Sequence, residues 1–310
     1  MAVRELTRSP GLLGLYARAA APLIPGASLL PFVGGSGREI PQLQLRLSDA
    51  RSDPDRLAAY AKVCGFTLRN QLPASFPHVL AFPLHMALMT DPSFPFGAVG
   101  LVHIENQIVQ HEPIGLRQPL SLHVRATPLQ AHPKGQSFSI LTDAFLAGRL
   151  VWSERSTMLR RGSGGAPTQD AEGSAAKDPE NGSGTKPAER KSPSRASAQW
   201  HLPGDLGRRY GAVSGDRNPI HTHALSAKLF GFPRAIAHGM WSLAHCLAAL
   251  EGPLPDRFTI DVRFGRPILL PATVNFTETA TAEGIEIELT DTDAKQTHLS
   301  AAVHNRVQGP

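Results

Sequence analysis

Forty consecutive residues, from Arg160 to Gln199, contain no Val, Ile, Leu, Met, Phe, Trp or Tyr. The segment is rich in Gly, Ser, Ala and Pro, and it carries seven basic and five acidic side chains. Such a segment cannot bury enough apolar surface to offset the entropy that it would lose on ordering. We therefore predict a flexible linker over residues 160–199, which joins a domain of residues 1–159 to a domain of residues 200–310.

The two regions that flank this linker resemble each other. YAKVCGF (60–66) aligns with YGAVSGD (210–216), and FPHVLAFPLHMALM (76–89) aligns with FPRAIAHGMWSLAH (232–245). Between these two matches the first copy is six residues shorter, and strand-like stretches with a Pro-Ile pair follow in both copies. Because the matches occur in the same order, we predict an internal duplication; the alternative is chance similarity between short apolar segments.

Apolar periodicity predicts the secondary structure of the second copy. HGMWSLAHCLAALEG (238–252) carries leucines at positions 243, 247 and 250 and is followed by a proline, which is typical of a long helix and its end. Apolar and polar residues then alternate in FTIDVRF, ATVNFTETAT, IEIELTDT and THLSAAVHNRV, which predicts strands. One long helix followed by antiparallel strands predicts the α+β class, with the sheet covering the helix.

The N-terminal region predicts a helix and no targeting segment. Leu12, Leu13, Tyr16 and Ala19 recur at helical spacing, whereas Arg18 interrupts the apolar run that a secretory signal would need. No apolar run reaches the length that a bilayer span requires. We therefore expect a cytoplasmic protein without a membrane span.

Charge and cysteine content exclude further classes of protein. The net charge is +5, but the basic residues are scattered rather than gathered in a stripe, so no nucleic-acid partner is expected. Cys64 and Cys246 have no CxxC spacing, which argues against a disulfide framework and a zinc ribbon and favours a reducing compartment. The mild positive surplus suits an anionic small ligand.

Polar and titratable residues gather in SGDRNPIHTHALSAKLFGFPRAIAHGM (214–240). Asp216 and His221 lie five residues apart, and Pro219 prevents a regular helix through them, so a turn can direct both side chains at one water molecule. One alternative is that Asp216 and Asn218 only form Asx turns. Another is a metal site with the nearby histidines, but no Cys or Glu completes a familiar ligand spacing, and we predict no metal.

DRNPIH (216–221) followed by HGM (238–240) resembles the signature of the MaoC-like, (R)-specific enoyl-CoA hydratase family, the hydratase 2 type. The resemblance implies a double hot-dog fold, in which antiparallel sheets each wrap around a central helix. It also implies (R)-specific hydration and dehydration, which interconvert trans-2-enoyl and (R)-3-hydroxyacyl thioesters of coenzyme A or acyl carrier protein in fatty-acid metabolism. No cofactor is needed, because the thioester carbonyl acts as the electron sink. The chain is expected to be a monomer or a homodimer.

The resemblance also assigns roles to single residues. Asp216 and His221 become the catalytic pair, and Asn218 holds Asp216 in place by a hydrogen bond. Gly239 becomes the oxyanion donor. It lies at the predicted start of the long helix, where free N–H groups favour negative charge, and without a Cβ it lets a carbonyl approach closely. His238 is a candidate for a supporting hydrogen bond.

The first copy lacks these residues. Phe66 aligns with Asp216, Pro83, which has no N–H to donate, aligns with Gly239, and the six missing residues fall in the segment that carries His221. By the family pattern, the first copy is a scaffold that widens the acyl tunnel, and it also completes a dimer-like interface. Two other functions stay open: a non-catalytic acyl-thioester binding protein and a hot-dog acyl-CoA thioesterase.

Overall fold

The computed structural model describes residues 1–20, 39–162 and 196–305, so most of the predicted linker lies outside the described residues. The ends of the linker differ from the prediction by two residues on each side. Arg160 and Arg161 end strand β7 (Arg149–Arg161), and Ala198 and Gln199 begin strand β8 (Ala198–Leu202). Backbone pairing with β6 and β10 holds these residues in the sheet despite their polar side chains.

Each half begins with a strand and one or more helices and continues with a central helix and antiparallel strands. The first half contains β1 (Ala2–Leu6), α1 (Leu12–Ala20), β2 (Leu43–Ala50), α2 (Pro54–Cys64), α3 (Phe76–Met89), β3 (Leu101–Gln110), β4 (Leu120–Ala126), β5 (Gln130–His132), β6 (Gly135–Leu146) and β7. The second half contains β8, α4 (Leu206–Ser214), α5 (Pro219–Thr222), α6 (Ala224–Leu229), α7 (Gly239–Ala249), β9 (Phe258–Phe264), β10 (Ala272–Ala280), β11 (Gly284–Asp291) and β12 (Thr297–His304).

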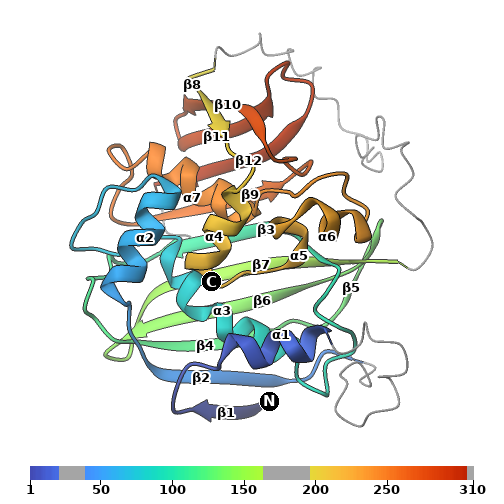
Figure 1. Ribbon diagram of the computed structural model, residues 1–310. Helices are drawn as coiled ribbons and strands as arrows, with labels where there is room; N and C mark the ends of the chain where they lie inside the picture. The colour runs from blue at the N-terminus through green and yellow to red at the C-terminus, as the bar shows by residue number, and fades with distance from the viewer. Residues whose placement is uncertain (21–38, 163–195, 306–310) are drawn as a thin grey trace, which may run out of the picture.

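The strands of the described residues form one continuous sheet in the order β1-β2-β4-β6-β7-β3-β9-β12-β11-β10-β8, with β5 paired to β6. Strands β3 and β9 pair antiparallel at the junction of the two halves (Figure 1). Outward from this junction the first half presents β3, β7, β6, β4 and β2, and the second half presents β9, β12, β11, β10 and β8. The chain order is the same in both directions, so the halves share one topology, as an internal duplication predicts.

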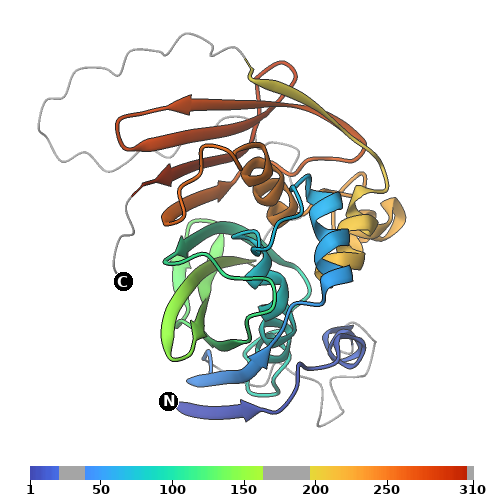
Figure 2. The ribbon, with the colours of Figure 1, turned by 90° about the vertical axis from the view of Figure 1, so that its left-hand side faces the viewer.

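Each half-sheet encloses a helix. In the first half the strands curve around α3 (Figure 2), whose residues are all buried except Ala87. Apart from His78 and His85, α3 is apolar around its whole circumference, which is the composition of a helix that protein surrounds on every side. Helix α7 takes the same place in the second half. The α+β class and the double hot-dog fold are therefore confirmed, with one parallel pair, β1 and β2, at the sheet edge.

The helix and strands predicted for the second copy are confirmed by α7 and by β9 to β12. The predicted N-terminal helix is confirmed by α1, but its apolar face differs: Leu15 and Ala19 are buried, whereas Leu13 is 88% exposed. Among the described residues, no helix combines the length and the apolar character that crossing a bilayer would require.

The structure corrects the alignment of the two copies. The Leu72 N–H donates to the Ile114 carbonyl at 2.8 Å, and the Ala237 N–H donates to the Ile268 carbonyl at 2.9 Å. Ile114 and Ile268 belong to the Pro-Ile pairs that both copies share. Leu72 therefore corresponds to Ala237, and the first copy spans with residues 65–72 what the second copy spans with residues 215–237. The missing stretch is longer than six residues and removes the whole polar turn.

The corrected alignment also changes which residues of the first copy are equivalent to the catalytic candidates. Pro73 and Ala74, rather than Phe82 and Pro83, take the positions of His238 and Gly239. Pro83 lies inside α3. The sequence comparison was wrong here because a shared Phe-Pro pair, at 76–77 and 232–233, precedes two apolar segments that occupy different positions relative to their helices.

Candidate active site

A cavity of about 470 Å³ lies between the two halves. The second half contributes the side chains of Asp216, His221 and His238 to its wall, together with Gly239. The first half contributes residues of α3 and β3, among them His78 and His103. All the residues that the sequence nominated for catalysis therefore meet in one cavity, and so does part of the copy that lacks the motif.

Asp216 lies in a turn directly after α4. Gly215 ends that helix with φ of 89°, a left-handed conformation that glycine adopts without strain. The Asp216 carboxylate accepts the backbone N–H of Asn218 at 3.1 Å, and its side chain is 31% exposed, towards the cavity. The turn thus presents an acceptor whose second oxygen stays available.

Asn218 reaches Asp216 through its backbone rather than through its amide side chain. The side-chain oxygen of Asn218 instead accepts the N–H of Ile220 and caps α5, with Pro219 as the first helical residue. Asn218 therefore hydrogen-bonds to Asp216 through its backbone N–H. Its contribution is to shape the turn.

His221 lies on α5 and is buried. Its Nδ1 is 2.8 Å from the carbonyl oxygen of Ile236, so this nitrogen carries the proton and donates it. Burial lowers the pKa of His221, and the nearby Asp216 only partly opposes that effect. The ring is neutral at neutral pH, and its Nε2 is an acceptor.

His238 precedes α7 and supports both catalytic candidates. Its Nε2 donates to the backbone oxygen of Asp216 at 3.0 Å, and its ring stacks on His221 with centroids 3.6 Å apart. Burial, with a further contribution from His221, lowers the pKa of His238 to about 3. Its Nδ1 is buried and has no hydrogen-bond partner in the described part of the chain. A neutral His238 thus fixes the Asp216 backbone and the plane of the His221 ring.

Gly239 is the first residue of α7, so its backbone N–H has no hydrogen-bond partner within the helix. A Cβ added at this position would lie 2.9 Å from Cδ1 of Phe264. Any larger residue would therefore have to displace the Phe264 ring. Gly239 lines the cavity, so the helix start offers a donor at the cavity wall, and only glycine leaves room beside it.

The carboxylate of Asp216 and ring nitrogens of His221 and His238 all lie within 4.8 Å of one another. Such a group is compatible with a metal ion, but His221 Nδ1 and His238 Nε2 already donate to backbone carbonyls. The absence of a metal from the reaction stays a prediction. His223, by contrast, is exposed and is not part of this group.

The surroundings of Asp216 favour its ionised form. Burial alone would raise the pKa of this carboxyl, but His238, His221 and the Asn218 N–H outweigh that effect and lower the pKa. Two acceptors, the carboxylate and His221 Nε2, therefore share one space. A water molecule between them can donate a hydrogen to each and present its oxygen to an electrophile.

Two residues of the first half support the Asp216 turn, and sequence analysis missed this role for both. The Tyr16 hydroxyl donates to the Gly215 carbonyl at 2.8 Å and accepts the Arg217 N–H at 2.6 Å, so it contacts the backbone on both sides of Asp216. Arg56 donates to the carbonyls of Val213 and Ser214, at the end of α4. Helical periodicity places Tyr16 on a packed face, but no local pattern indicates a partner 199 residues away.

Comparisons with known proteins give similarities over both halves. Residues 185–302 match the family model of the MaoC like domain. The chain is 35% identical over 300 residues to 3-hydroxyacyl-thioester dehydratase X of Mycobacterium tuberculosis, which covers 96% of this chain and 99% of that protein. It is 28% identical over 171 residues to the peroxisomal enoyl-CoA hydratase 2 of Arabidopsis thaliana, covering 51% and 52% of the two chains. A crystal structure of HtdX from M. tuberculosis has a TM-score of 0.71 at 33% identity, covering 84% of this chain and 98% of that one.

Proposed function

The chain belongs to the MaoC-like dehydratase family, a family of hydro-lyases, and we propose that it catalyses (R)-specific hydration of trans-2-enoyl thioesters and the reverse dehydration of (R)-3-hydroxyacyl thioesters. The observation that carries this proposal is the convergence of two acceptors, Asp216 and His221, at the free N-terminus of α7. Two relatives that are named for this chemistry, a dehydratase and a hydratase, support it.

In the hydration direction, Asp216 and His221 hold and deprotonate the water. As the water oxygen bonds to the β-carbon of the enoyl thioester, its proton passes to this pair. The electron pair of the carbon–carbon double bond moves towards the thioester carbonyl and forms an enolate. Asp216 and His221 then return the proton to the α-carbon. One water molecule is thereby added, and the site is regenerated.

Gly239 stabilises the enolate in this proposal. Gly239 lines the cavity at the positive end of an eleven-residue helix, where developing negative charge is favoured. Loss of one such donor typically lowers a rate by about 100-fold or more. Because the thioester carbonyl itself takes up the electron pair, the reaction needs no cofactor.

We assign coenzyme A or acyl carrier protein as the carrier of the substrate. Basic side chains from both halves line the same cavity: Lys134, Arg161, Arg263 and Arg266. Arg263 is 81% exposed and reaches Glu105 at 3.5 Å, which keeps it at the sheet surface. These cations suit the phosphates that both carriers share. The first half widens the acyl part of the cavity and completes a dimer-like arrangement within one chain. Cytoplasmic location and a monomeric or homodimeric state remain part of the proposal.

The experiment that tests this function follows the absorbance of the enoyl-thioester bond when purified protein meets crotonyl-CoA and then a longer trans-2-enoyl-CoA. Hydration that is lost in Asp216→Asn supports the proposal, and chiral analysis of the product tests its (R) configuration. Release of free coenzyme A, detected with a thiol reagent, would instead indicate a thioesterase. Tight binding of either substrate without turnover would indicate a binding protein.

A further inference from the structure

A row of aromatic and imidazole rings leads from the proposed oxyanion site into the first half. The Phe264 ring lies against Gly239, and His103 contacts Phe264 with ring centroids 4.9 Å apart. His78 follows at 6.5 Å from His103, and His85 at 5.2 Å from His78. All four rings line the cavity that holds Asp216. The wall that the first half contributes to the cavity therefore carries three imidazoles, a polar lining that a purely alkyl chain would not use.

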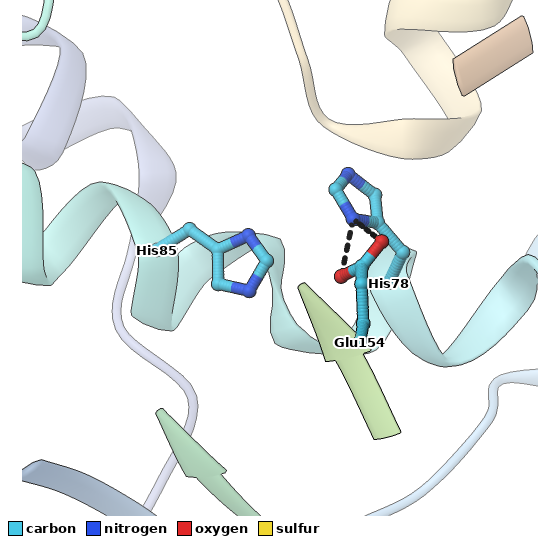
Figure 3. A group of neighbouring side chains, drawn as sticks. All are labelled: His78, His85 and Glu154. Atoms are coloured by element: carbon cyan, nitrogen blue, oxygen red, sulfur yellow. Dashed lines mark hydrogen bonds and ion pairs between the residues drawn. The ribbon is translucent and has the colours of Figure 1, made fainter. Parts of the chain in front are cut away.

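His78 is held in a fixed orientation by a buried carboxylate. Its Nδ1 is 2.9 Å from both oxygens of Glu154, whose side chain is fully buried and also accepts the amide of Asn106 at 2.8 Å. Figure 3 shows that the opposite ring nitrogen, Nε2, points away from Glu154. Because Nδ1 is committed to Glu154, Nε2 is the nitrogen that His78 can offer to a ligand.

The pKa values of the three imidazoles are shifted in different directions. Burial alone would lower the pKa of His78, but the Glu154 carboxylate outweighs that effect and raises it, while the pKa of Glu154 falls to about 2. Burial and the charge of His78 lower the pKa of His103 to about 4 and that of His85 to about 3. The row therefore combines one imidazole whose protonated form is favoured with two whose neutral form is favoured and can donate or accept.

His103 has a free hydrogen-bonding atom. Its Nε2 is buried and has no partner within the described residues. A buried polar atom without a partner is costly unless a ligand or water satisfies it. Apolar side chains of Phe82, Met89 and Met158 surround the same space and suit the methylene groups of a chain.

From this arrangement we propose that His78 and His103 form a polar subsite for an acyl chain that carries a hydroxyl group beyond C3, between apolar walls that bind its methylene groups. The proposal rests on the proposed function, because it names the class of thioester that the same cavity takes.

A metal site fits these residues less well. Nitrogens of His78 and His85 and an oxygen of Glu154 do lie within 4.8 Å of one another. However, His78 and Glu154 already bind each other, and His85 Nε2 binds the Thr142 hydroxyl at 2.7 Å. A metal ion would have to break these bonds, whereas a hydroxyl group needs only the atoms that remain available.

The test compares kcat/KM for trans-2-octenoyl-CoA with its 6-, 7- and 8-hydroxy derivatives. We expect one hydroxylated substrate to be preferred about tenfold over the unsubstituted chain, as one good hydrogen bond allows. His103→Phe keeps a ring of similar shape and should remove this preference. His123→Phe is the matched control, because His123 packs on Phe145 outside this cavity and should leave the preference unchanged.

The outcomes separate this subsite from the proposed function. If the wild-type protein hydrates octenoyl-CoA but prefers none of its hydroxylated derivatives, the subsite is refuted and the function stands. If it hydrates no thioester, both fail. If the preference for the hydroxylated substrate persists in His103→Phe, the same kcat/KM comparison is made with the double variant His78→Leu, Glu154→Leu. This variant removes both partners of the buried pair, so that neither is left buried without the other. If the preference also persists in the double variant, the subsite is refuted. It is likewise refuted if the wild-type protein binds one equivalent of zinc and His85→Ala does not.

Discussion

The two halves of this molecule have the same strand order, but they differ in the segment between the short helix and the central helix. The second half uses residues 215–237 to build the polar turn, and the first half crosses the same distance with residues 65–72. The first half nevertheless contacts the turn through Tyr16 and Arg56 and lines the cavity with α3 and β3. The first half therefore lacks the polar turn but still contacts that turn and lines the cavity, and in the proposed function it positions Asp216 and binds the acyl chain.

The contrast between the two halves requires that the reacting groups lie in the second half. We expect His221→Ala or Asp216→Asn to lower kcat by roughly 100-fold to 10,000-fold, because each removes one of the two groups that can take up the proton of the water. Circular dichroism should show a folded protein in both cases. Asp205→Asn is the control in the same half, since its side chain caps nothing; full activity is expected there. Near-normal rates in both site variants would reject the assignment.

Gly239→Ala tests the contribution of the helix start. The new Cβ would collide with Phe264 and displace the carbonyl from the Gly239 N–H, so we expect kcat to fall about 100-fold. Gly252→Ala is the matched control, because a Cβ there meets nothing within 4 Å. A rate for Gly239→Ala within twofold of that control would show that this N–H does not stabilise the transition state.

Tyr16→Phe tests whether the first half positions Asp216. The variant keeps the ring but loses both hydrogen bonds to the turn, and we expect kcat to fall about tenfold with little change in KM. The acid limb of the pH profile should also shift, since the surroundings of the Asp216 carboxylate change. Leu13→Ala, on the exposed side of α1, should change neither quantity. An unaltered profile with reduced thermal stability alone would make Tyr16 only structural.

Acid should destabilise both halves in the same way. His85 and His238 are buried with pKa values lowered to about 3, so the unfolded chain binds more protons than the folded one below pH 6.5. Stability is therefore present above pH 6.5 and falls on acidification, by about 1.4 kcal/mol per pH unit for each histidine. Denaturant unfolding between pH 7 and 5 measures this slope. His85→Gln should make it shallower, whereas an unchanged slope would show that His85 does not contribute.

The sequence predicted the second half better than the first, for a physical reason. Alternation over β9 to β12 and the apolar positions of α7 are local patterns, and the spacing of Asp216, Pro219 and His221 already allows a turn that brings the carboxylate and the imidazole together. The contacts of Tyr16 and Arg56, by contrast, join segments more than 150 residues apart, and no local pattern encodes them.

The cavity histidines of the first half were missed for a related reason. In FPHVLAFPLHMALM, His78 and His85 look like isolated polar residues on an apolar helix. Their meaning depends on Glu154, which lies on a strand 76 residues later. The alignment of the two copies failed at the same helix, because apolar composition alone does not reveal where a buried helix begins.

The antiparallel pairing of β3 with β9 has an evolutionary consequence. Two identical subunits joined at such a junction would receive every mutation twice, once on each side of the cavity. Here the two sides are encoded separately, so a change in α3 or β3 alters the wall of the cavity once and leaves the motif untouched. The covalent duplication thereby lets selection change the lining of the cavity independently of the turn that carries Asp216.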